Sequence, residues 1–195
     1  MKEFKEISAE EISESPFKMI GKDWMLVAAE KEGKINAMTA SWGGLGVMWN
    51  KNVAYVFLRP QRYTKEFVDS SETFSLTFYD ESSRKKLQYL GSVTGRLEDK
   101  MAKAGLTAVS GEAAPYFEEA RVVMICRKKY AQSYDPECFI DKSLDGTFYP
   151  EKDYHTMYIA EIEKILVREY DRKRLPAKRG RLVILFVFLK RLVVL

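Results

Sequence analysis

The chain has 195 residues, of which 46% are hydrophobic and 13% aromatic, so it can bury the core of one globular domain. Its net charge is +4, but residues 171–195 hold eight Lys and Arg against one acid, which leaves the rest of the chain mildly acidic. Lys and Arg in that larger part are interleaved with Asp and Glu, a pattern that gives no indication of a nucleic-acid-binding surface.

The N-terminus and the cysteines indicate the compartment. Residues 1–15 are polar and acidic, unlike a signal or transit peptide, so we expect a cytoplasmic protein. Cys126 and Cys138 are too few for a disulfide framework, and their spacing relative to the single His155 matches no zinc signature. Two reduced thiols and no bound metal are therefore predicted.

Apolar periodicity predicts short strands with helices between them. Helical turns are expected over residues 8–20, and loops over 135–142 and 145–150. The expected strands cover residues 24–29 and 35–41 (a hairpin), 53–58, 74–79, 106–109, 121–127 and 154–167, and the expected helices cover 64–68, 83–90 and 99–104. Six or more strands with inserted helices favour a mainly β (α+β) fold, a barrel with helical additions, over an alternating βαβ sheet.

Residues 170–195 differ from the domain predicted over residues 1–169. They combine a basic run with eight uninterrupted apolar residues, 182–189, whereas a bilayer-spanning helix needs about twenty. A basic, apolar segment could lie on an anionic membrane surface, but this one shows little amphipathic periodicity. We therefore favour an atypical tail that is foreign to the domain, and we do not expect a membrane partner.

The predicted strand at 35–41 leads into a segment with the composition of an anion site. Thr39 and Ser41 would lie on one side of this strand, and Gly43 and Gly44 follow directly. Hydroxyls and glycine-exposed backbone N–H groups suit a phosphate ester. The alternative, a strand end that runs into a glycine turn, is common in β proteins and stays open on this segment alone.

A second cluster, RPQRYT, follows the next apolar strand. Arg59 and Arg62 are three residues apart, and Thr64 is expected to cap a helix whose N-terminus would favour an anion. Guanidinium groups bind phosphate bidentately. The alternative is a surface turn whose arginines pair with Glu66 or Asp69. The two clusters together predict a phosphorylated small molecule as the ligand.

The common nucleotide-binding loops do not occur in the sequence. In the segment from Gly44 to Trp49, Trp49 occupies the position of the third glycine of a dinucleotide-binding fingerprint. The sequence also contains no Walker loop. A third polar segment, residues 92–100, places Arg96 and Lys100 in a glycine-punctuated loop. A solvated connection is the simpler explanation of that loop from its chemistry alone.

Four segments carry a family resemblance. They are NAMTASWGGLGVMW (36–49), RPQRYT (59–64), the GR-x-x-DK turn that ends at Lys100, and DYHTMYIAEI (153–162). Together they resemble the flavin reductase-like family of FMN-binding split-barrel proteins, close to the flavoredoxins, from about residue 12 to residue 168. The resemblance implies a six-stranded FMN-binding split β-barrel, non-covalent FMN, and a homodimer with each flavin near the subunit interface.

The resemblance also implies roles for individual residues. Segment 36–41 would line the isoalloxazine and the phosphate, Trp42 would lie beside the flavin, and RPQRYT would hold the ribityl phosphate. His155 matches a histidine that approaches the flavin in some members and is the candidate catalytic residue, with a purely structural role equally open. The implied cofactor-binding residues are Asn36, Ala37, Met38, Thr39, Ser41, Trp42, Arg59, Arg62, Tyr63, Thr64 and Lys100.

The function implied by the resemblance is redox chemistry on a bound cofactor. FMN accepts a hydride from NAD(P)H, and the protein orients and tunes it, so no carboxylate pair or Ser/His/Asp arrangement is needed. We expect an oxidoreductase that passes electrons from NAD(P)H through FMN to flavin or another acceptor. The alternative is an FMN-holding electron carrier that is reduced by a protein partner.

Overall fold

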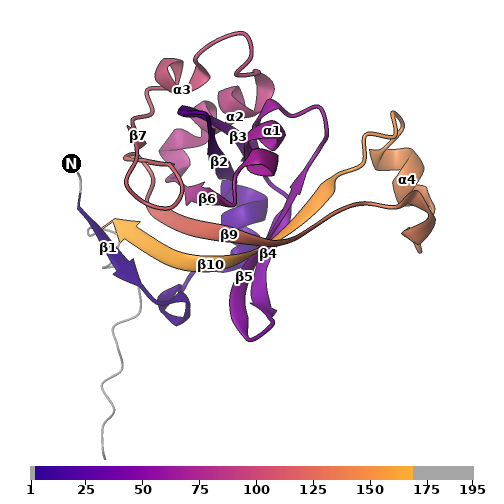
Figure 1. Ribbon diagram of the computed structural model, residues 1–195, viewed down its shortest axis with the longest axis horizontal. Helices are drawn as coiled ribbons and strands as arrows, with labels where there is room; N and C mark the ends of the chain where they lie inside the picture. The colour runs from indigo at the N-terminus through magenta and orange to yellow at the C-terminus, as the bar shows by residue number, and fades with distance from the viewer. Residues whose placement is uncertain (1–2, 169–195) are drawn as a thin grey trace, which may run out of the picture.

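A computed structural model of the chain describes residues 3–168. Its strands are β1 (Phe4–Ile7), β2 (Met25–Lys31), β3 (Lys34–Ala40), β4 (Gly43–Met48), β5 (Lys51–Leu58), β6 (Thr73–Phe78), β7 (Ala108–Val109), β8 (Tyr116–Phe117), β9 (Val122–Ser133) and β10 (Thr156–Arg168). Within this range an eight-stranded sheet has the order β3-β2-β6-β9-β10-β5-β4, with β1 added beside β10 (Figure 1). A separate small sheet pairs β7 with β8.

The two ends of the main sheet are neighbours in the chain. β3 ends at Ala40 and β4 begins at Gly43, so Ser41 and Trp42 alone connect one end of the strand order to the other. Such a link spans at most about 11 Å, because consecutive Cα atoms are 3.8 Å apart. The sheet must therefore roll until β3 and β4 lie close together, and the barrel is split between these two strands.

Two tight hairpins set the register on either side of the split. β2 and β3 are joined by Glu32 and Gly33, with φ of 51° and 76°, and β4 and β5 are joined by Trp49 and Asn50, with φ of 53° and 57°. Two successive residues with positive φ form the turn whose twist matches that of antiparallel strands. The predicted β2–β3 hairpin is confirmed.

The sequence pattern did not predict β4, because its glycines look like a turn. Gly43 lies so close to β5 that a Cβ at this position would be 2.6 Å from the main-chain oxygen of Tyr55. Glycine is therefore required by the approach of the two strands. β1 was also not predicted, since it is short and largely polar; it is placed by antiparallel pairing with β10.

The helices are short and lie between the strands. They are the 3-10 turns η1 (Ala9–Glu11), η3 (Glu81–Ser83) and η4 (Pro136–Cys138), the π-helix η2 (Phe17–Asp23), and the α-helices α1 (Tyr63–Ser70), α2 (Arg84–Ser92), α3 (Lys100–Lys103) and α4 (Ser143–Phe148). Arg62 is the N-cap of α1, so the predicted cap at Thr64 is wrong, and Thr64 lies in the first turn. α2 ends at Ser92, two residues beyond the predicted helix over 83–90.

Alternation along the strands divides the core into two clusters. In β2, Met25 and Val27 face the barrel interior, where they pack with residues of β5, β6 and β10. Leu26 and Ala28 face the opposite side, where they pack with Leu87 and other residues of α2. This period of two is the expected consequence of a sheet that is buried on both faces. The barrel and its helical cover therefore form one packed body.

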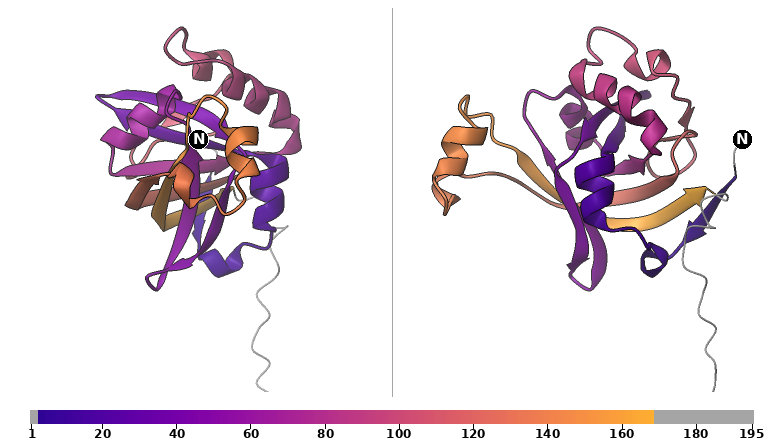
Figure 2. Two further views of the ribbon diagram at one scale, coloured as in Figure 1. Left: turned by 90° about the vertical axis from the view of Figure 1, so that its right-hand side faces the viewer. Right: turned by 180° about the vertical axis from the view of Figure 1, so that it is seen from behind.

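Residues 134–155, which connect β9 to β10, form an arm that projects from the barrel (Figures 1 and 2). Loops were predicted here, but part of the arm is helix α4. Arg59 holds the base of the arm, because it pairs with Asp153 and donates from Nη2 to the main-chain oxygen of Phe148 at 2.8 Å. Ile140, by contrast, is 98% exposed.

The predicted mainly β fold with inserted helices is confirmed. Within residues 3–168 the main sheet has eight strands, whereas the resemblance implied six. In the same range no helix is long and apolar enough to cross a bilayer. The tail predicted over residues 170–195 lies outside the described residues.

Candidate functional site

A hollow of about 150 Å³ lies at the split of the barrel. It is formed by the end of β3, the link between β3 and β4, the end of β5 with the turn into α1, and the residue before β10. These segments carry most of the residues expected to bind the cofactor, so the fold brings them together. The lining residues are Met38, Thr39, Ala40, Ser41, Trp42, Phe57, Arg59, Arg62 and His155.

The two arginines of the hollow differ in their partners. Arg59 pairs with Asp153, which also accepts a hydrogen bond from Gln61 Nε2 at 2.6 Å. Arg62 has no acidic partner among residues 3–168, and its Nη1 donates to the main-chain oxygen of Gly91 at 2.9 Å. A guanidinium has five N–H donors, so Arg62 keeps most of its donors for another acceptor. Arg62 is therefore the better anion-binding group.

The surface pairing that the sequence left open for these arginines does not occur. Glu66 pairs with Arg96, and Asp69 pairs with Lys65 at 2.7 Å. The guanidinium carbon of Arg96 also lies 4.3 Å from the ring centre of Tyr63. Tyr63 therefore belongs to this neighbouring charged cluster and does not line the hollow.

The two predicted hydroxyls both line the hollow but are not equivalent. Thr39 Oγ1 donates to the main-chain oxygen of Leu87 in α2 at 2.6 Å. Gly91 lies against the same side chain, since a Cβ there would be 3.2 Å from Thr39 Cβ. For the Ser41 hydroxyl, the described part of the chain offers no hydrogen-bond partner. Thr39 therefore attaches β3 to α2, while Ser41 keeps its proton for a ligand.

The free edge of β3 adds main-chain groups to the site. The closing pair of a two-residue hairpin, here Lys31 and Lys34, is hydrogen-bonded, and hydrogen-bonded pairs then alternate along the strands. The main-chain N–H and C=O groups of Asn36, and of every second residue after it, therefore point toward β2. Those of Ala37 and Thr39 point away from β2, toward the free edge. Because the Ala37 side chain is buried, the contribution of this residue would come from its main chain.

Asn36 and Thr64 are not among the lining residues. Each is 1% exposed, and Asn36 Nδ2 donates to Thr64 Oγ1 at 2.9 Å. The Oδ1 atom of Asn36 is buried without a hydrogen-bond partner within residues 3–168. Gly95 makes room for it, because a Cβ at that position would overlap Oδ1. The Asn36–Thr64 bond ties β3 to the first turn of α1, directly after Arg62.

Lys100 is also placed outside the hollow. It is 3% exposed, and its Nζ donates to the main-chain oxygens of Leu90 at 2.9 Å and Val93 at 3.0 Å. It therefore satisfies carbonyl groups at the C-terminal end of α2, which have no partner inside the helix. Burial lowers the pKa of Lys100 to about 8, and the nearby charge of Arg62 contributes to this shift.

His155 lies in the wall of the hollow and is 7% exposed. Its Nδ1 is 2.8 Å from the hydroxyl oxygen of Tyr149, and its ring centre is 5.1 Å from that of Trp42. Burial lowers the pKa of His155 to about 4, and the positive charge of Arg59 acts in the same direction. At neutral pH the imidazole is therefore uncharged.

Two residues of this site were not predicted from the sequence. Phe57 lines the hollow from β5, and Tyr149 holds the imidazole of His155. The alternation of β5 contained a signal for Phe57, because neighbouring strand residues face opposite sides. Tyr149 lies in a segment that the sequence predicted as a loop, and its pairing with His155 depends on how the arm folds.

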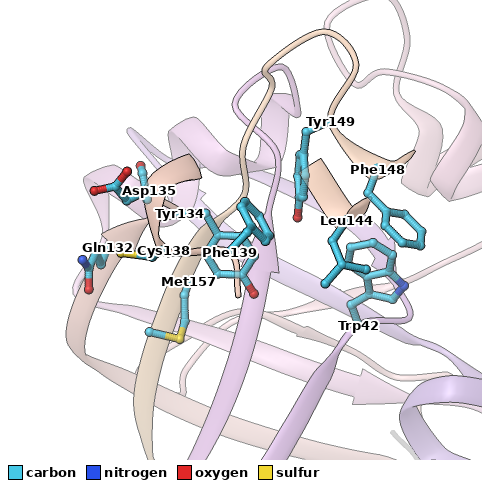
Figure 3. A pocket seen from close by; sticks show the side chains of 11 residues that line it. Trp42, Gln132, Tyr134, Asp135, Cys138, Phe139, Leu144, Phe148, Tyr149 and Met157 are labelled. Atoms are coloured by element: carbon cyan, nitrogen blue, oxygen red, sulfur yellow. The ribbon is translucent and has the colours of Figure 1, made fainter. Parts of the chain in front are cut away.

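A larger cavity, of about 590 Å³, lies beside the hollow, and Trp42 lines both. It is formed by the arm together with the facing ends of β9 and β10 (Figure 3). We call it the arm cavity. The site thus has a small polar compartment that contains two arginines and a larger aromatic compartment next to it.

Comparison with known proteins places the chain in a family. Residues 18–185 match the family model described as Flavin reductase like domain, a range that runs past residue 169, where the predicted domain ends. A stretch of 99 residues is 33% identical to an uncharacterized protein of Aeropyrum pernix and covers 49% of this chain. That stretch covers 37% of the relative, so the match spans little more than a third of its length.

Solved structures share the fold. The FMN-binding domain of a flavin reductases-like enzyme from Shewanella baltica has a TM-score of 0.62 at 16% identity, over 86% of this chain and 78% of that chain. The flavoredoxin of Desulfovibrio vulgaris has a TM-score of 0.59 at 25% identity, over 75% of this chain and 70% of that chain. Since the family model covers most of the sequence, the chain belongs to the flavin reductase-like family.

Proposed function

We propose that this protein binds FMN at the split of its barrel and acts as a cytoplasmic oxidoreductase that passes electrons from NAD(P)H through FMN to flavin or another acceptor. The main support is the hollow, because its lining contains both Arg62, free of acidic partners in the described chain, and Ser41, whose hydroxyl has no hydrogen-bond partner there. A phosphate monoester is bound by such a combination of a guanidinium fork and a hydroxyl donor.

The residues of the hollow fit one end of FMN. At about 150 Å³ the hollow is smaller than an ordinary ligand pocket of roughly 300–1,000 Å³, so it would take the phosphate end and not the whole cofactor. Arg62 and Ser41 would hold the phosphate. The free edge of β3 at Ala37 and Thr39 would supply donors and acceptors to the ring system, with Trp42 as an aromatic neighbour.

The cofactor, when bound, supplies the hydride and electron-transfer chemistry. The residues of the chain bind it, orient it and control its surroundings. Arg62 balances part of the phosphate charge, and Trp42 offers an aromatic face beside the ring system. His155 is uncharged and can form a hydrogen bond at the cofactor without adding a second positive charge to the two arginines.

We also propose a homodimer in which the arm packs against a second copy of the chain. The arm projects from the barrel and carries Ile140, which is almost fully exposed, and Val47 and Trp49 are exposed on the β4–β5 hairpin. Large apolar side chains exposed in this way mark interaction surfaces. Sedimentation equilibrium should give a dimer, and Ile140→Lys should shift it toward the monomer.

The second candidate function is the electron carrier. It is supported by the likeness to a flavoredoxin at 25% identity. Anaerobic titration separates the two functions, because an NAD(P)H-dependent oxidoreductase loses its yellow colour with NADH or NADPH. A carrier would bleach with dithionite but not with either nicotinamide nucleotide.

The decisive experiment for FMN binding is to purify the protein and identify its chromophore. A yellow sample that releases FMN on heating is the expected result, and apo-protein should regain the colour when FMN is added. If the apo-protein shows no saturable FMN binding in a fluorescence titration, the proposed function is wrong.

A further inference from the structure

A groove of about 560 Å³ lies between the start of β3, the loop before α3, α3 itself and the small β7–β8 sheet. We call it the α3 groove, and its apolar lining consists of Ile35, Leu97, Met101, Leu106 and Phe117. Leu97 is 86% exposed, so the described chain leaves apolar surface of the groove uncovered. An apolar groove with such an exposed side chain is typical of an interaction surface.

The charged residues around the α3 groove give it an acidic edge. Asp99 lines the groove, Glu119 accepts a hydrogen bond at 3.0 Å from the main chain between two lining residues, and Glu118 precedes it in the sequence. Within residues 3–168 none of these three carboxylates pairs with Lys or Arg. Of the basic lining residues, Arg96 already pairs with an acid of α1, which leaves Lys34. The edge therefore favours a basic partner.

Strand β10 ends beside this groove. Arg168, its last residue, donates from Nη2 to the main-chain oxygen of Glu118, which follows Phe117 of the groove lining (Figure 1). The chain therefore continues from a point next to the groove. Residues 169–181 can span at most about 45 Å, because an extended chain covers roughly 3.3–3.6 Å per residue. The segment 182–189 that follows is thus within reach of the whole groove.

The composition of this continuation complements the groove. Residues 182–189, LVILFVFL, are all apolar, and leaving them in water is unfavourable whatever their origin. Residues 172–181 hold six Lys and Arg and no acid, a charge opposite to that of the groove edge. A segment tethered to its own domain also meets that domain at a high effective concentration, which a separate partner lacks. Length, charge and apolarity thus favour an occupant from the same chain.

We propose that segment 182–189 docks in the α3 groove of its own molecule, while the basic run 172–181 pairs with the acidic side chains at the groove edge. Burial of the apolar segment against Leu97 and the rest of the apolar lining supplies the driving force, and the opposite charges set its direction. The α3 groove shares no lining residue with the hollow, so this inference goes beyond the proposed function.

The test is photo-cross-linking in the full chain. Leu97→p-benzoylphenylalanine places a photoreactive ketone at the groove, and because Leu97 is exposed the substitution leaves the core intact. Trypsin cuts after Arg181 and Lys190, so the apolar segment is released as one peptide, 182–190. Irradiation should link this peptide to the probe. Ile140→p-benzoylphenylalanine, at a position on the arm that is 98% exposed, is the matched control and should give no such link.

Two further variants, each made in the chain that carries the probe at position 97, test the sequence requirement. Phe186→Asp places a charge within the apolar segment, so the yield of the cross-link should fall about tenfold, as expected when an aromatic side chain loses its burial. Val194→Asp introduces the same charge outside the segment and should leave the yield unchanged. Equal yields in these two variants would overturn the proposal.

Other occupants of the groove give different outcomes. When ¹⁵N-labelled and unlabelled chains are refolded together in equal amounts, a cross-link within one molecule joins two peptides of the same label. Mixed-label products as frequent as same-label products would show that a second copy of the chain fills the groove, and would overturn the proposal. The absence of any link to peptide 182–190 would overturn it too. Sedimentation of that protein with phosphatidylglycerol vesicles would then identify a membrane surface as the partner of the segment.

The outcomes also separate this inference from the proposed function. The cross-link should form in apo-protein and in FMN-loaded protein, because the groove and the hollow are separate. If FMN does not bind but the cross-link forms, the docking site stands and the proposed function fails. If FMN binds but no cross-link forms, the proposed function stands and the docking site is wrong.

Discussion

The Nδ1 atom of His155 lies 2.8 Å from the hydroxyl oxygen of Tyr149. Burial raises the pKa of the Tyr149 phenol, so the hydroxyl keeps its proton and is able to donate a hydrogen bond to Nδ1. The imidazole is neutral, because burial lowers the pKa of His155 to about 4, so it carries one proton, on either Nδ1 or Nε2. We predict that Tyr149 is the donor in this pair, which places the proton of His155 on Nε2.

This relationship predicts a single tautomer for His155. ¹⁵N chemical shifts of the one histidine in the chain should show a protonated Nε2 and an unprotonated Nδ1 at pH 7. In Tyr149→Phe the donor is lost, so the two tautomers should become mixed. Tyr154→Phe, a neighbouring tyrosine that bonds Asp145, is the matched control and should keep the wild-type shifts. A protonated Nδ1 in the wild type would contradict the assignment.

The low pKa of His155 also makes stability depend on pH. The ordinary pKa of 6.5 applies to the unfolded chain and the value of about 4 to the folded one, so between these values the unfolded state binds more protons. Stability should therefore fall by roughly 3 kcal/mol as the pH drops through this window. His155→Gln removes this component. In urea unfolding, the free energy of unfolding of His155→Gln should approach that of the wild type as the pH is lowered. A difference between the two proteins that is the same at every pH would refute the prediction.

Arg62 and Arg59 should contribute differently to FMN binding. Arg62→Ala should weaken FMN about 10–100-fold, because a hydrogen bond to a charged group contributes roughly 1.5–3 kcal/mol. Arg59→Ala removes the same charge, but its guanidinium is committed to Asp153 and Phe148. The Arg59 variant should lose less affinity and show faster proteolysis within residues 134–155. Equal FMN affinities in the two variants would mean that Arg62 is not the phosphate ligand.

Lys100 should stabilise the end of α2. Lys100→Met leaves the oxygens of Leu90 and Val93 without their donor, so the free energy of unfolding should fall by about 1–3 kcal/mol. The folded pKa of Lys100, about 8, is below the ordinary 10.5, so between these pH values the unfolded state binds more protons. The free energy of unfolding of the wild type should therefore rise as the pH is raised from about 8 to 10.5, and the variant should lack this rise. Lys103→Met, on the exposed side of α3, is the control and should change little.

The position of Asn36 depends on a glycine in the loop after α2. Gly95→Ala would place a methyl group on Asn36 Oδ1, so chemical denaturation should show a loss of about 1–3 kcal/mol. Gly146→Ala is the matched control, since a Cβ there has open space and alanine is the better helix former within α4. If both substitutions are neutral, the close packing of Asn36 against this loop is not maintained in solution.

Strand patterns and turn residues made much of the fold predictable. The β2–β3 hairpin and strands β5, β6, β9 and β10 were expected because their apolar residues recur with the period of a strand. Helix α4 and strand β4 were not. The glycines of β4 have no apolar period, and what makes this segment a strand is the approach of Gly43 to Tyr55, which is a tertiary contact.

The candidate site shows the same division. The sequence indicated Arg59, Arg62 and Ser41 as a group, and one hollow contains all three. It did not distinguish the two arginines, because the partner of Arg59 is Asp153, 94 residues later in the chain. Nor did it show that Lys100 would be buried as a helix cap.

By itself, the sequence determined the chemical groups of this protein, the short-range turns and the family to which it belongs. These depend on neighbouring residues and on the order of motifs, both of which can be read along the chain. Only the tertiary structure decided which of the predicted groups remain free to bind a ligand. That outcome depends on contacts between distant segments. Such contacts occupy the donor groups of Arg59, Thr39 and Lys100. Arg62 and Ser41, by contrast, keep donor groups that can bind a ligand.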